Sequence, residues 1–158
     1  DIVAMIWFFR KFHPKFVSKK ELGKNIPSVS YNLRHGGSVL IDRKDPKQAV
    51  PTIKILSEYI ELHKRSAVIF PEGTRSKGGP IKEFKAGSFK LATKSKSPIV
   101  PVTIDGSYKI MEHGNGPWIK PAIVNLYIHP AIETASLNRE EQEELHKKVQ
   151  DIISSKLS

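Results

Sequence analysis

Apolar residues along the chain fall into short runs separated by polar, glycine-containing segments. The first run, residues 2–12, is apolar on nearly every side. We expect a short helix there that ends before Pro14, because the residue preceding a proline avoids the helical conformation. The runs with the length and residue types of strands are residues 15–18, 39–41, 67–70, 99–104 and 123–128. Pro101 interrupts one of these strands, which is typical of a sheet edge or a bulge.

Helical stretches separate these strands. One helix is expected after Asp45-Pro46, with apolar residues at helical spacing from position 53 to position 60, and Pro51 favours a regular start near itself. Two more are expected over residues 86–94 and 138–156. The latter has glutamates in its first turns, where the helix dipole favours anions, and an apolar stripe of Leu145, Val149, Ile152, Ile153 and Leu157. Short strands that alternate with helices predict an α/β fold with a central, mostly parallel or mixed sheet flanked by helices.

The length of the chain limits the number of domains that it can form. A chain of 158 residues suits one domain with a buried core, so we expect a single domain over residues 1–158. The longest apolar run, residues 2–9, is shorter than the roughly 20 residues that cross a bilayer. The chain opens on Asp1 rather than Met, directly before that run, which is typical of a domain truncated at its N-terminus.

Charge narrows the class of partner. Lys and Arg number 26 against 16 Asp and Glu, a formal net charge of +10, which favours an anionic membrane or a nucleic acid. A nucleic-acid-binding module interleaves exposed aromatics with its cations, whereas the aromatics here concentrate in the first apolar run and at single strand positions. We therefore expect no nucleic-acid partner. The absence of cysteine excludes thiol nucleophiles, and the six histidines lack zinc-like spacing, so no metal site is expected.

Residues 70–76, Phe-Pro-Glu-Gly-Thr-Arg-Ser, follow a predicted buried strand, and ligands in open α/β sheets bind at the carboxyl ends of strands. Gly73 lets the backbone approach an anion, Thr74 offers a hydroxyl donor, and Arg75 offers a planar fork that matches phosphate oxygens. Glu72 fits beside a phosphate if it orients the arginine or accepts from a substrate hydroxyl. A surface turn with an exposed arginine is the alternative that these residues leave open.

This segment closely resembles the third signature block of the lysophosphatidic acid acyltransferase family, the 1-acylglycerol-3-phosphate acyltransferases of the PlsC type. Residues 39–43 (Val-Leu-Ile-Asp-Arg) resemble the second block, residues 84–89 the phenylalanine-lysine-x-glycine segment, and residues 99–102 the fourth block. The blocks agree in order and spacing, and the resemblance spans residues 1–107. On these motifs the chain is identified as a member of that family.

The resemblance implies a catalytic role for Asp1. It stands where the family has the aspartate of a histidine–four residues–aspartate motif, so the histidine would lie five positions upstream, outside the chain. In the family that histidine is the general base on the glycerol hydroxyl, and the aspartate orients its imidazole. Without it, we expect the 158 residues alone to have negligible acyl transfer. The alternative role of Asp1 is capping the helix that follows.

Further substrate contacts are implied at three positions. Arg43 and Lys85 would join residues 72–75 around the headgroup phosphate, and Pro101 lies in the block that the family associates with the acyl donor or acyl chain. From the residues alone, Arg43 could equally be a surface arginine paired with Asp42 or Asp45.

The four-residue spacing between histidine and aspartate recurs at His146 and Asp151. Both fall in the last predicted helix, where side chains five positions apart point about 140° away from each other. They also follow the phosphate block instead of preceding it. We therefore expect a solvated helix face there and no second dyad.

The resemblance implies transfer of a fatty acyl group from acyl carrier protein or acyl-coenzyme A to the 2-hydroxyl of lysophosphatidate. The product is phosphatidate for phospholipid synthesis, and no cofactor is needed. The expected partners are the lysophospholipid, the acyl thioester and an anionic membrane surface, and the expected location is the cytoplasmic face of a membrane, which the aromatic first helix suits. The alternatives are an acyltransferase for another lyso-lipid, such as a lyso-ornithine lipid, or a non-catalytic lipid- or nucleic-acid-binding relative.

Overall fold

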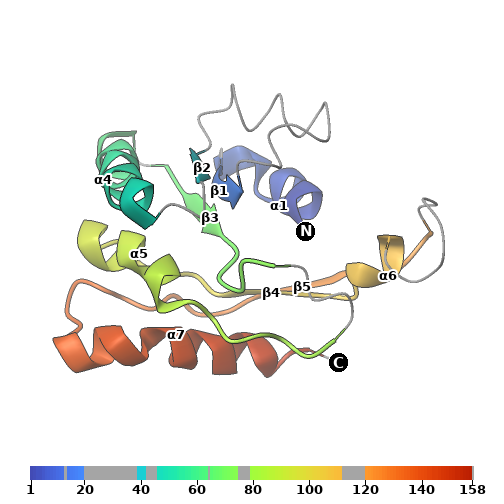
Figure 1. Ribbon diagram of the computed structural model, residues 1–158. Helices are drawn as coiled ribbons and strands as arrows, with labels where there is room; N and C mark the ends of the chain where they lie inside the picture. The colour runs from blue at the N-terminus through green and yellow to red at the C-terminus, as the bar shows by residue number, and fades with distance from the viewer. Residues whose placement is uncertain are drawn as a thin grey trace. The chain divides into compact units, whose positions relative to one another are not determined.

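The structure, a computed structural model, describes residues 1–12, 14–19, 39–41, 46–63, 65–74, 79–111 and 120–157. Two compact units make up the chain, Asp1–Phe70 and Pro71–Ser158 (Figure 1). The expectation of a single domain over residues 1–158 stays a prediction. Within the described residues, no helix combines the length and the apolar character needed to cross a bilayer.

The first unit is built on a parallel sheet of three strands. In spatial order they are β2 (Val39–Ile41), β1 (Lys15–Lys19) and β3 (Ala67–Ile69). Val17 of β1 pairs with Val39 on one side and with Ile69 on the other. Because β2 and β3 both run parallel to β1, their carboxyl ends lie at the same edge of the sheet. The predicted parallel strands are thereby confirmed, and residues 39–41 and 67–69 end at a common edge.

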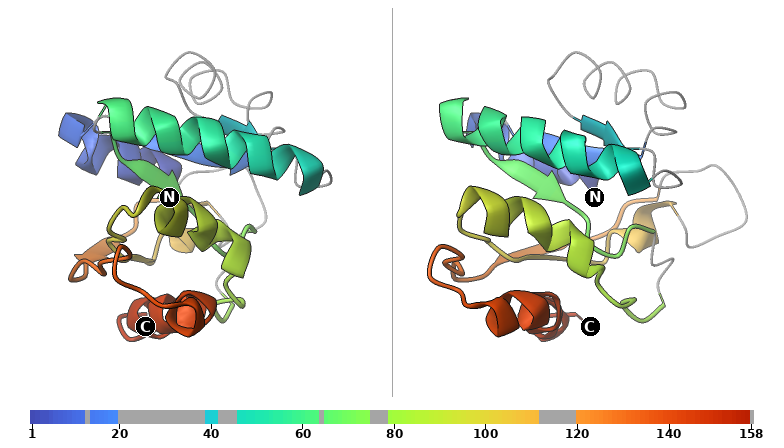
Figure 2. Two further views of the ribbon diagram at one scale, coloured as in Figure 1. Left: turned by 90° about the vertical axis from the view of Figure 1, so that its left-hand side faces the viewer. Right: turned by 60° about the vertical axis from the view of Figure 1, so that its left-hand side comes forward.

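Helices flank this sheet within the first unit. They are α1 (Ile2–Phe8), the 3-10 turn η1 (Arg10–Phe12) and α4 (Pro46–His63). Figures 1 and 2 show α1 and α4 on opposite faces of the sheet. Met5 of α1, Phe16 of β1 and Leu56 of α4 are all buried, so each element contributes an apolar side chain to the interior of the unit.

Two helix boundaries differ from the expectation. The first helix ends at Phe8 and a 3-10 turn follows, so the run of residues 2–12 is not one helix. The helix α4 begins at Pro46 and continues through Pro51, so the predicted start near Pro51 is wrong. Proline at the first helical position has no hydrogen bond to lose, which explains the start at Pro46.

The second unit combines short helices with an antiparallel pair of strands. Its elements are η2 (Ala86–Phe89), α5 (Lys90–Ser95), β4 (Val102–Asp105), α6 (Tyr108–Met111), β5 (Asn125–Ile128) and α7 (Arg139–Ser154). In the β4–β5 ladder, Val102 pairs with Ile128 and Asp105 with Asn125. Figures 1 and 2 show this ladder lying between α5 and α7. With the parallel sheet of the first unit, it confirms the predicted α/β class.

The strand expected over residues 99–104 is shorter than predicted. The strand β4 begins at Val102, immediately after Pro101, while Ile99 forms an isolated antiparallel bridge with Ile132. A proline has no N–H to give to a ladder, and the interruption at Pro101 follows from that.

The core of the second unit forms between α7 and the segment around η2. Phe84, Phe89, Leu145 and Val149 are buried together. The predicted apolar stripe of the last helix is thus confirmed at Leu145 and Val149, which lie one turn apart on one face, whereas Leu157 beyond the helix is 39% exposed. The partly buried side chains that pack against this core are Ile81, Ile99, Ile132, Leu137 and Ile153.

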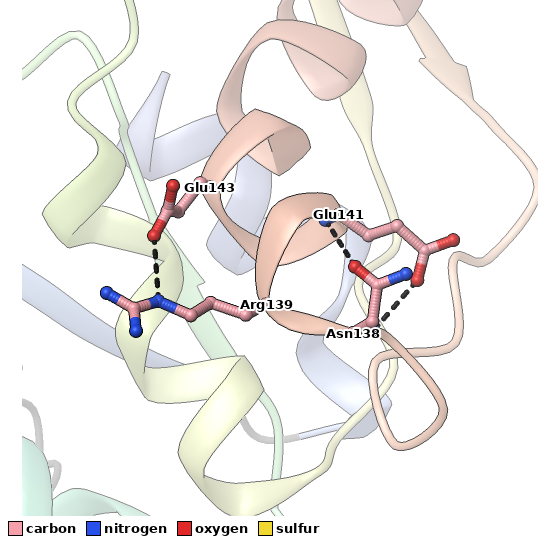
Figure 3. Close-up of polar contacts among 4 residues, drawn as sticks. All are labelled: Asn138, Arg139, Glu141 and Glu143. Carbon is pink, nitrogen blue, oxygen red and sulfur yellow. Dashed lines mark hydrogen bonds and ion pairs between the residues drawn. The ribbon is translucent and has the colours of Figure 1, made fainter.

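The helix α7 starts with a capping box (Figure 3). The Asn138 side chain accepts a hydrogen bond from the Glu141 N–H at 2.9 Å, and the Glu141 carboxylate accepts one from the Asn138 N–H at 2.8 Å. Two N–H groups that the helix itself leaves unpaired are satisfied in this way, which stabilises such helices by about 1 kcal/mol. Beside it, the exposed ion pair of Arg139 with Glu143 contributes little.

A buried hydroxyl joins the strand ladder to the end of α7. Thr103 of β4 is fully buried, and its Oγ1 donates to the Ile153 carbonyl at 2.9 Å. The same oxygen lies 2.8 Å from Nε2 of His129, which follows β5. The last carbonyls of a helix have no partner within the helix, so this hydroxyl satisfies one of them.

Candidate substrate-binding site

The segment expected to bind phosphate leaves β3 through a tight turn. Pro71 and Glu72 form the turn, and Gly73 follows with φ of +69°, a conformation that strains residues with a side chain. Thr74 is exposed directly after it, and Arg75 lies outside the described residues. The backbone conformation therefore favours glycine at position 73, in addition to any approach of a ligand.

Two hydrogen bonds, one between backbone groups and one to a side chain, fasten this turn to the segment that contains Lys85. The Lys85 N–H donates to the Pro71 carbonyl at 3.1 Å, and the Lys82 N–H donates to the Glu72 carboxylate at 3.1 Å. The third signature block and the phenylalanine-lysine segment therefore lie side by side. The described contact gives Glu72 a third role, bracing the loop, besides the two that the sequence suggested. Its contact with substrate stays a prediction.

The residues before η2 alternate between the interior and the surface. Phe84 is 3% exposed and belongs to the core, whereas Lys85 is exposed and has an extended backbone (φ −75°, ψ 116°). The buried ring thus anchors the chain where the lysine backbone meets the Pro71 turn. The Lys85 backbone is therefore adjacent to the turn that leads into Gly73 and Thr74, and a cation, a hydroxyl and a glycine turn are groups that can bind an anion.

A third contact comes from α7. The Phe84 N–H donates to Oε1 of Gln150 at 2.9 Å, across 66 positions of sequence, and Gln150 is half-buried. Sequence reasoning missed this glutamine, because no local pattern distinguishes it from the other polar residues of an amphipathic helix.

Pro101 is buried at the start of β4. Its carbonyl accepts a hydrogen bond from the His129 N–H at 3.0 Å, which extends the β4–β5 ladder by one step beyond Val102. This contact explains how the chain keeps its pairing at a residue that cannot donate. The contribution of Pro101 to acyl-donor binding stays a prediction.

Asp1 belongs to the first unit, where it occupies the N-cap position of α1. Its main-chain carbonyl accepts from the Met5 N–H at 2.9 Å, but its side chain makes no capping hydrogen bond and is exposed. The capping alternative thus has no side-chain contact behind it, and the catalytic role of Asp1 stays a prediction. Arg43 lies outside the described residues, so its predicted phosphate contact stays a prediction too.

The second histidine–aspartate pair forms no site. Both residues lie on α7, where Asp151 is exposed as expected. His146 is half-buried, and its Nδ1 is enclosed without a hydrogen-bond partner among the described residues, so the solvated-face expectation is wrong for the histidine. The buried residue Leu145 precedes it, which explains why this flank of the helix turns inward.

Comparison with known proteins establishes the family. The sequence profile of the family described as Acyltransferase matches residues 1–105. The chain belongs to this acyltransferase family, and the resemblance drawn from its motifs is confirmed. The matched residues include Asp1 and every other candidate site residue named from the sequence.

Curated relatives carry one activity in their names. A 1-acyl-sn-glycerol-3-phosphate acyltransferase of Borreliella burgdorferi is 32% identical over 97% of this chain and 60% of its own length. One from Helicobacter pylori is 39% identical over 66% of this chain and 45% of its own. A chloroplastic one from Brassica napus is 38% identical over 75% of this chain and 34% of its own. The chain thus spans between about a third and three fifths of the length of these relatives.

A solved structure agrees in fold. The crystal structure of the 1-acyl-sn-glycerophosphate (LPA) acyltransferase PlsC from Thermotoga maritima matches with a TM-score of 0.69 and 31% sequence identity. The match covers 90% of this chain and 55% of that one. It therefore extends well beyond the residues of the family profile and supports the α/β assignment for both units.

Proposed function

We propose that the protein containing this chain transfers a fatty acyl group from acyl carrier protein or acyl-coenzyme A to the 2-hydroxyl of lysophosphatidate, giving phosphatidate. The observation that carries the proposal is the Gly73–Thr74 turn fastened beside Lys85 in a chain of this family. The names of the relatives support lysophosphatidate as the acceptor. The headgroup phosphate would be held by Thr74, Arg75 and Lys85, with Arg43 as a further cation.

The proposed reaction needs a base and an activated acyl donor. A histidine five positions before Asp1 takes the proton of the 2-hydroxyl, and Asp1 holds its imidazole in the correct tautomer. The hydroxyl oxygen attacks the thioester carbonyl carbon, the carbon–sulfur bond breaks, and the imidazolium returns the proton to the thiolate, which leaves as a thiol. Because a thioester is already activated, we propose no metal, organic cofactor or covalent enzyme intermediate.

Acceptor preference tests this proposal. The complete polypeptide, with whatever residues precede Asp1, is assayed with lysophosphatidate and with a 1-acylglycerol of the same chain length. We expect kcat/KM to be at least about a hundredfold higher for lysophosphatidate, because two charge-assisted hydrogen bonds to phosphate are lost with the other acceptor. Equal rates would contradict the headgroup assignment, and a preference for a lyso-ornithine lipid would favour the alternative acceptor.

The proposal includes docking on an anionic membrane at the cytoplasmic face, and exposed aromatic residues of the first unit support the docking. Trp7 is 68% exposed, Phe8 47% and Phe12 63%. The Arg10 guanidinium lies 5.4 Å from the Trp7 ring centroid, so a cation accompanies the exposed indole. Aromatics with adjacent cations suit the headgroup region of a bilayer. Side chains with these exposures do not fit plain core packing.

Trp7 provides a direct measurement of docking. The chain has two tryptophans, so a Trp118→Phe variant leaves Trp7 as its single indole. We expect its emission to shift to the blue and to be quenched by brominated lipids in vesicles of phosphatidylglycerol and phosphatidylcholine, with a weaker effect at high salt. Leu62→Ser is the control, because Leu62 is 78% exposed on α4 and should leave binding unchanged. Vesicle binding without any change in Trp7 emission would exclude this face as the contact.

A further inference from the structure

Among the residues that the structure describes, a glutamine of α7 forms a hydrogen bond with the segment that contains Lys85. Gln150 accepts the Phe84 N–H at 2.9 Å, and the next N–H along the chain, from Lys85, donates to the Pro71 carbonyl at 3.1 Å. Consecutive backbone groups of one short segment are therefore fixed on opposite sides, by a helix and by the phosphate-binding turn. The position of this segment determines the position of the lysine and of the turn together.

The burial of the Phe84 ring limits the directions in which its backbone N–H can point. Its ring is 3% exposed in the core with Leu145 and Val149 of the same helix, so its backbone cannot turn its N–H to water without moving the ring. A partly buried N–H that loses its acceptor is costly, and the segment would shift to recover one. A shift would displace Lys85 and loosen its hydrogen bond to Pro71.

We propose that Gln150 is a positioning residue for the acceptor headgroup: it holds the Phe84–Lys85 backbone so that Lys85 and the Gly73–Thr74 turn together form the phosphate site. This inference rests on the proposed function. It assigns a role in substrate binding to a helix that lies outside residues 1–105, the part that the family profile matches. Gln150 touches no reacting atom, so it acts through the backbone that it holds.

Steady-state kinetics of the complete polypeptide test the proposal. In Gln150→Met, a side chain of similar length that accepts hydrogen bonds poorly, we expect the KM for lysophosphatidate to rise about tenfold. The KM for the acyl thioester and kcat should stay within about twofold, because the thioester does not depend on the phosphate site. Gln150→Glu retains an acceptor oxygen and should restore most of the affinity.

A matched control exists in the same helix. Gln142 also makes a side-chain hydrogen bond to the backbone, donating from Nε2 to the Leu137 carbonyl at 3.0 Å, but at the opposite end of α7. Gln142→Met should leave both KM values unchanged. If Gln150→Met raises the two KM values equally, lowers only the melting temperature or changes nothing, the glutamine is merely structural and the inference is wrong.

A binding measurement separates this inference from the proposed reaction. Glycerol 3-phosphate is titrated into the same polypeptide, and the amide resonances of Gly73, Thr74 and Lys85 are followed by NMR. We expect Gln150→Met to weaken this binding about tenfold and to speed hydrogen exchange at the Phe84 amide. If the polypeptide turns over lysophosphatidate and Gln150→Met leaves glycerol 3-phosphate binding unchanged, the inference about Gln150 is wrong and the proposed reaction stands. If glycerol 3-phosphate binding depends on Gln150 but lysophosphatidate is not turned over, the proposed reaction is wrong and the inference stands. If neither binding nor turnover is observed, both are wrong.

Discussion

Replacing Asp1 with asparagine is expected to lower kcat for acyl transfer by about 10³–10⁴-fold, with little change in either KM. Asparagine matches the size of aspartate but carries no charge to stabilise an imidazolium, and its amide can hold the histidine in the wrong tautomer. The fold should tolerate the change, because the Asp1 side chain makes no capping hydrogen bond and α1 starts from its main-chain carbonyl. Rates and melting temperatures of the complete polypeptide measure both effects.

The matched control is Asp151→Asn. Asp151 also follows a histidine by five positions, but it is exposed on α7 and its histidine turns partly inward. We expect its substitution to leave kcat within about twofold, because surface substitutions of this kind are usually close to neutral. An Asp1→Asn enzyme that keeps more than a tenth of its kcat, or an equal loss in both variants, would remove Asp1 from the catalytic machinery.

Replacing Gly106 with alanine is expected to destabilise the second unit by about 3 kcal/mol. Gly106 has φ of +82°, a conformation that L side chains rarely adopt, and a Cβ there would lie 2.6 Å from the Ile123 carbonyl oxygen. That oxygen belongs to the backbone, so it cannot move away as the end of a flexible side chain could. The melting temperature should fall by about 10 °C, measured by thermal denaturation.

Gly87 supplies the matched control for this substitution. A Cβ at Gly87 would meet nothing within 4 Å, and its φ lies outside the range that strains a side chain. Gly87→Ala is therefore expected to leave stability unchanged or to raise it by up to about 1 kcal/mol, because alanine has less freedom to lose on folding. Equal destabilisation in the two variants would mean that the contact with Ile123 does not exist in solution.

Strands were predictable from the sequence where short apolar runs ended at turn-forming residues. Residues 39–41 and 67–69 are strands for that reason, and the amphipathic spacing around Leu145 and Val149 indicated α7 correctly. The short helix α6 was missed, because four residues after a glycine are too few to show a helical period. The start of α4 was predicted near Pro51 because proline disfavours the interior of a helix. In the structure the helix continues through this proline.

The candidate site, too, was predictable from the sequence only in part. The motif around Gly73 indicated an anion-binding turn, and the positive φ at that glycine agrees with the residue type. The contacts that hold the turn were not predictable, because the Lys82 N–H on Glu72 and the Gln150 oxygen on Phe84 depend on how distant segments meet. Residue types state which groups can bind phosphate, whereas the partners that position those groups come only from the folded chain.

The direction of the hydrogen bonds at Thr103 assigns the state of a neighbouring imidazole. A hydroxyl has one hydrogen, and Thr103 gives it to the Ile153 carbonyl, which can only accept. The contact with His129 at 2.8 Å must then be donated by the ring, so Nε2 carries hydrogen. The strand ladder and the last helix are therefore joined by hydrogen bonds that run in one direction, from the His129 ring to the Thr103 hydroxyl and from that hydroxyl to the Ile153 carbonyl.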